Sequence, residues 1–450
     1  MKGLMSMQHR TLWRRLLALV LVLTLVGAAC GDDDDDAGSG NSGDSSEEDS
    51  GGEKTLGGMR GTTPLVDLGD EFKERLLETD PDLKDFNYAA ESYDAAVIIS
   101  LAVLKANTDG IEYAKEINGI TREGEKCTDF KACADLIKAG TDVDYDGQSG
   151  PLEFSGNGEP TEASYGVLEF GDDNKIDDTK TEYQTATAPP EADVDEVPVV
   201  GTRAGDGTLT IGTLLPQTGS LAFLGPPEFA GVDLAAEEIN AAGGVLGKPI
   251  VTIEGDSGDT ESNIANTTVD TQLNQNVDAI IGAASSSVTL SVVDKIVNAG
   301  VVMFSPANTS KKLSTYDDKG LYFRDAPSDI LQGQVLGEVI AADNITTVGI
   351  LALDDDYGTG LAEDLKKSLE EAGIEVGDPV IYDPKAQTFD SEVGDMKKED
   401  PEAIVVIGFD ESSRVLTEMV AQGVGPSSKA VYGVDGNMGN ALGENFSAGK

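Results

Sequence analysis

The sequence predicts an α/β fold with two lobes, each built on a parallel β-sheet flanked by helices. From Leu209 onward, short β-branched runs alternate with amphipathic stretches. Strand, helix and strand in this order and spacing give parallel strands with right-handed crossovers. The alternation breaks near residues 322–327, and the 450 residues leave room for two or three domains with cores of their own. We therefore expect two lobes rather than one large sheet.

The elements of this second block follow from local patterns. We expect strands at 209–214, 249–253, 279–282, 301–305, 348–353, 403–408 and 430–434. Phe229, Val232, Ala236 and Ile239 are spaced for one buried helical face, and a second helical pattern covers residues 360–372 and ends at a glycine. The block from 208 to 450 thus contains enough sheet for both lobes.

The first block, residues 55–187, has a different pattern. Helix-like runs cover 92–105 and 110–117, and a further helix is expected around Cys133. A hairpin at 151–160 and a strand at 164–170 follow. This is too little sheet for an independent α/β domain, so we expect the block to complete another unit. Residues 188–207 are rich in Pro, Ala and acids and indicate a linker.

The first 54 residues indicate export. Three arginines precede the apolar run 16–26, which is too short to span a bilayer, and Gly27-Ala28-Ala29-Cys30 follows. Residues 1–29 therefore read as a signal peptide, and the small residues before Cys30 resemble the bacterial lipobox, in which the cysteine carries the lipid. The alternative is an ordinary signal peptide with a chance cysteine. Residues 31–54 contain no large apolar side chain, which predicts a disordered acidic tether over 30–54.

Composition excludes several classes of function. The chain has 82 acidic residues against 32 basic ones, a formal charge of −50, and would repel a nucleic-acid backbone. Its single histidine, His9, lies in the signal peptide, so the mature chain has no imidazole for a catalytic triad or a metal. No other motif performs chemistry. We therefore expect neither an enzyme nor a cofactor.

Several motifs carry a family resemblance. TLTIGTLLPQTGSLAFLG, EEINAAGGVLGKPI, IIGAASSSVT, FSPANTS, YFRDAPSD, DDDYGTG, IGFDESS and YGVDG occur in this order. Together they resemble the substrate-binding proteins of branched-chain amino acid ABC transporters, of the periplasmic binding protein type I fold, whose lobes are joined by a hinge of crossing strands. GMRGTTP, the helix start Tyr93-Asp94-Ala95 and DYDGQSGPLEF also resemble this family. There, however, these elements come last.

The resemblance implies a circular permutation. Residues 55–187 would be the C-terminal part of the binding domain, 208–326 lobe I and 327–450 lobe II, with the old ends joined through the linker. Permutation is tolerated where termini lie at the surface. The alternative is a tandem gene that is truncated at both ends or misassembled.

Two loops of the first predicted lobe offer groups that suit a carboxylate. Ser285 and Ser286 follow one expected strand and precede an expected helix, where hydroxyl and backbone N–H groups bind anions. Without a ligand, they would simply cap the helix. Ala307 and Thr309 repeat the arrangement after the next strand. The resemblance places Ser286, Ala307 and Thr309 at the family's ligand-carboxylate positions.

The facing lobe supplies the opposite chemistry. Tyr357, Phe409 and Asp435 each follow a strand closely, so they should cluster at one edge of the sheet. The resemblance implies that Asp435 pairs with a ligand ammonium and that Tyr357 assists it. Phe409 stands where the family often has Tyr, which leaves a more apolar wall. Phe223 either lines the side-chain pocket or anchors its own loop.

Two further patterns are structural in our interpretation. Residues 142–153 fit the EF-hand pattern, but Pro151 and a strand follow where a helix is needed. We therefore expect no metal there. Cys127 and Cys133 are expected to form a small-loop disulfide in an oxidising compartment, with free thiols or a metal pair as the alternative.

The sequence and the family resemblance thus predict an extracytoplasmic lipoprotein, anchored to the membrane through Cys30, that captures a branched-chain amino acid and delivers it to an ABC importer permease. We expect a monomer. The alternatives are a binder of amides, urea or aromatic acids in the same fold, and a ligand sensor for a membrane receptor kinase.

Overall fold

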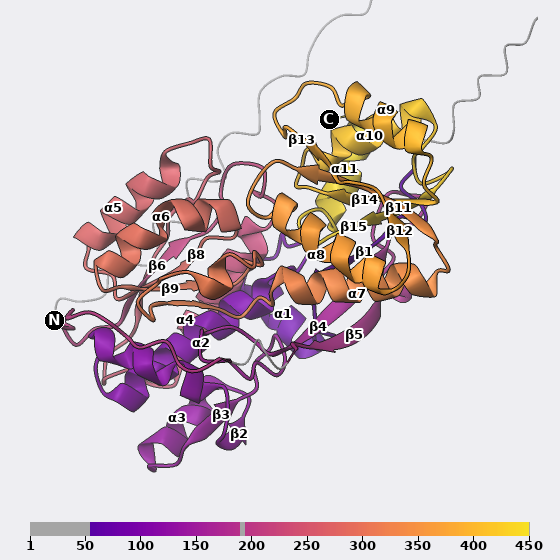
Figure 1. Ribbon diagram of the computed structural model, residues 1–450. Helices are drawn as coiled ribbons and strands as arrows, with labels where there is room; N and C mark the ends of the chain where they lie inside the picture. The colour runs from indigo at the N-terminus through magenta and orange to yellow at the C-terminus, as the bar shows by residue number, and fades with distance from the viewer. Residues whose placement is uncertain (1–54, 190–193, 450) are drawn as a thin grey trace, which may run out of the picture. The chain divides into compact units, whose positions relative to one another are not determined.

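The computed structural model describes residues 55–189 and 194–449 (Figure 1). The predicted signal peptide, the lipidation site Cys30 and the tether lie outside the described residues. The described chain contains two main sheets, one of five strands and one of eight, and a small two-stranded sheet. We use lobe I for the five-stranded sheet with its helices and lobe II for the eight-stranded sheet with its helices.

Lobe I has a fully parallel sheet in the order β10-β9-β8-β6-β7. Its strands are β6 (Thr210–Leu214), β7 (Val251–Ile253), β8 (Ala279–Gly282), β9 (Val302–Ser305) and β10 (Tyr322–Arg324). The connecting helices are α4 (Gly225–Ala241), α5 (Ile264–Asn274) and α6 (Ser286–Asn298). Every residue of β8 and β9 is buried, as a central strand covered by helices on both faces requires.

Lobe II has the strand order β12-β11-β14-β15-β1-β4-β5, and β13 pairs with β11. Its strands are β1 (Arg60–Pro64), β4 (Glu162–Glu169), β5 (Glu182–Thr187), β11 (Thr347–Leu353), β12 (Glu375–Val376), β13 (Val380–Tyr382), β14 (Ala403–Ile407) and β15 (Ala430–Gly433). Its helices are α7 (Asp329–Ala342), α8 (Gly358–Glu371), α9 (Asp390–Glu399), α10 (Ser412–Gln422) and α11 (Asn440–Ala448).

The first block completes both lobes. β1 pairs in parallel with the last strand, β15, so the indigo and magenta strands β1, β4 and β5 continue the sheet of the orange and yellow strands (Figure 1). Helices α1 (Asp70–Thr79) and α2 (Ala89–Ala106) instead join the core of lobe I, where α2 packs on α4. β2 (Glu125–Cys127), α3 (Phe130–Lys138) and β3 (Val143–Tyr145) form a small appendage.

Most expected elements are confirmed. All seven strands expected between 209 and 434 are present, as are the helices of both blocks. The pattern at 110–117 forms a 3₁₀ helix over Ile111–Glu116, and the helix expected at 92–105 begins earlier, at Ala89. The sheet of lobe II is mixed, because β4 and β5 form a hairpin and hairpin strands run antiparallel.

The linker is bound along lobe I rather than free over its described part. Val197 donates its N–H to the Gly156 carbonyl (2.9 Å) and Val200 to that of Lys319 (2.9 Å). Near the end of the linker, Asp109 accepts the N–H groups of residues 206–208. Within the described ranges, no helix has the length and apolar character needed to cross a bilayer.

Candidate functional site

Seven of the eight sequence-predicted ligand residues surround one small cavity between the lobes. Its lining consists of Tyr88, Leu221, Leu224, Ala284, Ser285, Ser286, Ala307, Thr309, Tyr357, Phe409, Asp435 and Gly436. The cavity measures about 10 Å³, the room of about one water molecule. The two walls therefore lie almost in contact, and an amino acid can enter only if they separate.

The lobe I wall is built from the loops that follow β8 and β9. Ser285 caps α6, because its Oγ accepts the Val288 N–H (3.3 Å). Ser286 begins the helix and accepts the Ser310 N–H at 3.2 Å. Ser286 and Thr309 are 3% and 1% exposed. This wall therefore presents buried hydroxyls beside a helix N-terminus, whose first N–H groups have no partners within the helix.

A buried arginine holds the second of these loops. Arg324, at the end of β10 and 0% exposed, donates from Nη1 to the carbonyls of Asn308 (3.1 Å) and Ser310 (3.0 Å). Its Nε donates to Glu159 (2.9 Å), which follows the 151–158 turn of the first block. Arg324 thus fixes the carbonyls on either side of Thr309. The Arg324 N–H also donates to the Gly158 carbonyl (2.9 Å), which ties the end of β10 to the first block.

The lobe II wall is centred on Asp435, directly after β15. Its carboxylate accepts hydrogen bonds from Tyr357 Oη (2.7 Å) and Tyr88 Oη (2.9 Å) and is 5% exposed. Burial raises the pKa of Asp435 above its ordinary value, and the two tyrosine hydroxyls oppose that shift. The two hydroxyls therefore orient a single carboxylate toward the cavity and favour its charged form.

Apolar groups fill the rest of the lining. The Tyr357 and Phe409 rings stack with centroids 5.3 Å apart. Leu221 and Leu224, in the loop between β6 and α4 of lobe I, line the same cavity. Phe223 is not in the lining. It packs half-buried near Gly439, as expected for an anchor of its own loop.

The arrangement offers donors on one wall and an acceptor on the other. Hydroxyls and free N–H groups of lobe I suit a carboxylate, and Asp435 suits a cation. The leucines and the stacked rings in the same lining suit an apolar group. Together these groups can recognise a ligand through hydrogen bonds, charge and apolar contact.

Sequence reasoning missed Tyr88, Leu221 and Leu224. Leu221 and Leu224 belong to the motif SLAFLG, where Phe223 drew attention because of its size. Tyr88 lies in the first block, directly before α2, with a left-handed backbone (φ 60°). In the sequence, 347 residues separate it from Asp435, so local patterns do not connect the two.

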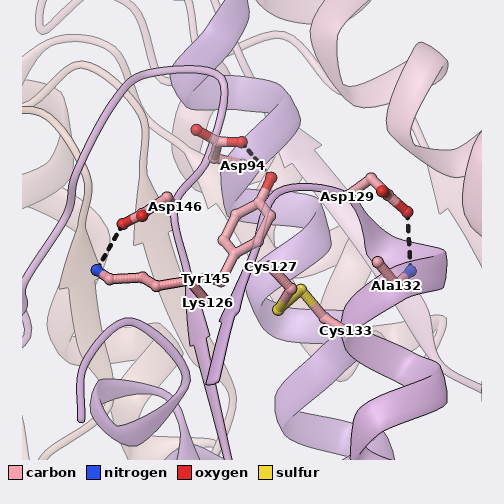
Figure 2. The surroundings of a disulfide bond; sticks show 8 residues. All are labelled: Asp94, Lys126, Cys127, Asp129, Ala132, Cys133, Tyr145 and Asp146. Carbon is pink, nitrogen blue, oxygen red and sulfur yellow. Dashed lines mark hydrogen bonds and ion pairs between the residues drawn. A yellow bond between two sulfur atoms is a disulfide. The ribbon is translucent and has the colours of Figure 1, made fainter. Parts of the chain in front are cut away.

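The EF-hand-like segment binds a side chain of the protein itself. Lys126 Nζ forms ion pairs with Asp144 (2.9 Å), Asp146 (3.0 Å) and Glu153 (3.4 Å). Figure 2 shows Lys126 beside the disulfide that joins Cys127 to Cys133. In the described ranges, no group of three or more acidic, histidine or cysteine side chains is arranged to hold a metal ion.

Comparison with known proteins agrees with this architecture. The model of the family described as "Periplasmic binding protein" matches residues 208–449, and the model "Receptor family ligand binding region" matches residues 38–173. The chain is 34% identical over 171 residues to a leucine-, isoleucine-, valine-, threonine- and alanine-binding protein of Pseudomonas aeruginosa, covering 38% of this chain and 45% of that protein. It is 28% identical over 226 residues to a chemotactic signal transduction substrate-binding protein of Halobacterium salinarum, covering 48% and 54%.

Among solved structures, the chain resembles the branched-chain amino acid transporter substrate-binding protein of Streptococcus pneumoniae in complex with isoleucine. The identity is 28% and the TM-score 0.47, over 54% of this chain and 68% of that one. The matched segments cover between 45% and 61% of the length of three curated relatives, so the chain spans about half of the proteins it resembles in sequence.

The matched family model covers more than half of the chain. Its members bind ligands without transforming them, which confirms the prediction that this chain is not an enzyme. By its fold and by this match, the chain belongs to the periplasmic binding protein family.

Proposed function

We propose that this protein captures a branched-chain amino acid between its lobes and delivers it to an ABC importer permease. The observation that carries the proposal is Asp435, a buried carboxylate fixed by two tyrosine hydroxyls and set opposite the hydroxyls of Ser286 and Thr309 in one lining. The α-ammonium would pair with Asp435 and the α-carboxylate with lobe I. The leucines and Phe409 would contact the side chain.

Two alternatives predict different ligands or outcomes. An amide, urea or an aromatic acid lacks the ammonium group and would leave the Asp435 charge unpaired in a desolvated site, which is costly. A sensor that reports to a membrane receptor kinase would bind an amino acid without import. The similarity to the Halobacterium protein, which is named as a substrate-binding protein of chemotactic signal transduction, supports this second alternative.

A thermal-shift screen of the mature protein tests the ligand class. Leucine, isoleucine and valine should raise the melting temperature by mass action, whereas urea, acetamide and benzoate should not. Asp435→Asn should abolish the leucine shift. The matched control is Asp354→Asn, because Asp354 is exposed three residues before Tyr357. A shift by benzoate with none by leucine would contradict the ammonium assignment.

We also infer that the order of segments is circularly permuted. Residues near both ends of the binding domain share one partner, since Asn174 accepts from the Leu56 N–H (2.7 Å) and donates to Ser447 Oγ (2.9 Å). The parallel pairing of β1 with β15 continues the sheet across this junction. A permuted order would also explain why two family models match separate segments. The intact mass of the mature protein, with peptides from residues 55–79 and 430–448 on one polypeptide, tests this. Two shorter products would favour a misassembled gene.

Lipid anchoring at Cys30 is a further part of the proposal, supported by the lipobox-like sequence alone. Growth with an alkyne fatty acid should label the wild-type protein and leave Cys30→Ala unlabelled. Labelling of the variant would place the lipid elsewhere, and an unlabelled wild type would indicate an ordinary signal peptide.

A further inference from the structure

One pair of side chains joins the two lobes beside the cavity without lining it. Ser287 lies in the first turn of α6 in lobe I, and Asp355 lies in the loop before α8 in lobe II. Ser287 Oγ donates to Asp355 Oδ2 at 3.0 Å and accepts the N–H of Asp356 at 3.2 Å. Neither Ser287 nor Asp355 is among the residues that surround the cavity. Ser287 and Asp355 therefore join the two walls to each other and do not contact the cavity itself.

The same carboxylate positions a residue that does line the cavity. Asp355 Oδ1 accepts the backbone N–H groups of Tyr357 (3.0 Å) and Gly358 (2.7 Å) and thereby caps the start of α8. Tyr357 in turn donates to Asp435. One carboxylate thus fixes the backbone that carries Tyr357 and, through its other oxygen, contacts lobe I.

Further contacts between the lobes lie along the same edge. Ser310 Oγ donates to the Asp356 carbonyl at 3.2 Å. Lys311 pairs with Asp364 at 2.9 Å, and Lys312 pairs with Asp356. The lysines are partly exposed, and exposed ion pairs contribute little. The hydrogen bond from Ser287 differs, because its acceptor, Asp355, is half-buried and its carboxylate accepts further hydrogen bonds from the backbone of lobe II.

We propose that Ser287 and Asp355 form a latch that stabilises the closed lobes and holds Tyr357 against Asp435. Both are positioning residues, since they act through Tyr357 and through lobe closure. The effect on amino-acid affinity rests on the proposed function, whereas the effect on lobe closure does not. Because the latch exists only in the closed form, its loss should speed ligand release and leave association nearly unchanged.

The test compares Ser287→Ala with two related variants. Ser287→Thr keeps the hydroxyl. Ser291→Ala removes a hydroxyl on the same helix that bonds only to the Val288 carbonyl (2.6 Å). Leucine association and dissociation rates are measured by surface plasmon resonance. Lobe closure without ligand is measured as the distance between two spin labels by double electron–electron resonance. The labels are attached at Thr267→Cys on α5 and Lys367→Cys on α8. The background carries Cys30→Ser, and Cys127 and Cys133 take no label because they are bonded to each other.

A hydrogen bond to a carboxylate changes an equilibrium constant roughly tenfold. Ser287→Ala should therefore raise the leucine dissociation rate roughly tenfold, with the association rate within about twofold, and should shift the label distances toward longer values. Ser287→Thr should restore both, and Ser291→Ala should change neither. An unchanged dissociation rate with unchanged label distances would overturn the latch. If leucine binds no form of the protein while the distances shift, the latch stands and the proposed function fails.

Discussion

Glu91 makes stability depend on pH in a direction opposite to that of a typical surface carboxylate. It lies in the first turn of α2, 6% exposed, and burial, with a smaller contribution from Asp94, raises its pKa from 4.5 to about 8. Glu228 on α4 and Asp325 after β10 are also buried, and electrostatic repulsion couples both to Glu91. Repulsion from Glu91 also contributes to raising the pKa of Tyr88, after burial and Asp435. Glu91 is therefore protonated in the folded protein at neutral pH.

The sign of the effect follows from the two pKa values. Below pH 4.5, Glu91 is mostly protonated in both folded and unfolded chains, so its ionisation does not lower the free energy of unfolding. Above that pH the unfolded chain ionises first, so stability is lost as the pH rises, until the folded carboxyl group also ionises near pH 8. A pKa raised from 4.5 to about 8 corresponds to a loss of as much as about 5 kcal/mol, since each pH unit contributes about 1.4 kcal/mol.

Glu91→Gln removes this loss, because the amide is a neutral isostere of the protonated acid. The free energy of unfolding of the variant, measured by urea titration at pH 5 to 9, should exceed that of the wild type by an amount that grows from about 1 kcal/mol at pH 5 to about 4 kcal/mol at pH 8. The control is Glu74→Gln, an exposed carboxylate on α1, which should give no such growth. If the difference in unfolding free energy between Glu91→Gln and the wild type stayed constant from pH 5 to 9, the pKa of Glu91 would not differ between the folded and unfolded chains.

Three other substitutions test the scaffold by urea titration. Cys133→Ser opens a disulfide of sequence separation 6 and should lower the free energy of unfolding by about 2 kcal/mol; no loss relative to the oxidised wild type would show that the bond does not constrain the chain. Arg324→Met leaves Glu159 buried without its partner and should cost about 3–5 kcal/mol. Adding Glu159→Gln to Arg324→Met should recover part of that loss in unfolding free energy. An equal loss in the single and the double variant would show that Arg324 and Glu159 are not coupled. Gly443→Ala brings a Cβ to 1.7 Å from a backbone carbonyl of the β4–β5 connection and should cost about 1–3 kcal/mol, whereas Gly394→Ala in α9, with its nearest atom at 3.7 Å, should be neutral or stabilising.

The parts that sequence predicted well are those set by local patterns. The buried strand Ala403–Ile407 and its neighbours are continuous apolar runs, which indicate central parallel strands. The seven site residues brought to one cavity each follow a strand or begin a helix, so the edge of the sheet on which they lie was predictable.

Other features depend on contacts far apart in sequence. Tyr88 meets Asp435 only through tertiary packing, and its own neighbourhood carries no site pattern. The short strands β2 and β12 have three and two residues, too few for a period to be detected. Asp355 lies in a run of three consecutive acids, and nothing in that run indicates that its second oxygen accepts a hydrogen bond from Ser287 on the other lobe.

The central claim is that Asp435 and the loops of lobe I together recognise an amino acid. Isothermal titration with leucine, 4-methylpentanoate and 3-methylbutylamine tests it, because the second compound lacks the ammonium and the third lacks the carboxylate. Leucine should bind the mature protein tightly, and the two analogues should bind at least roughly a hundredfold more weakly. Asp435→Asn should no longer bind leucine, whereas Asp354→Asn should retain binding. Equal binding of 4-methylpentanoate and leucine, or undiminished binding of leucine to Asp435→Asn, would contradict this claim.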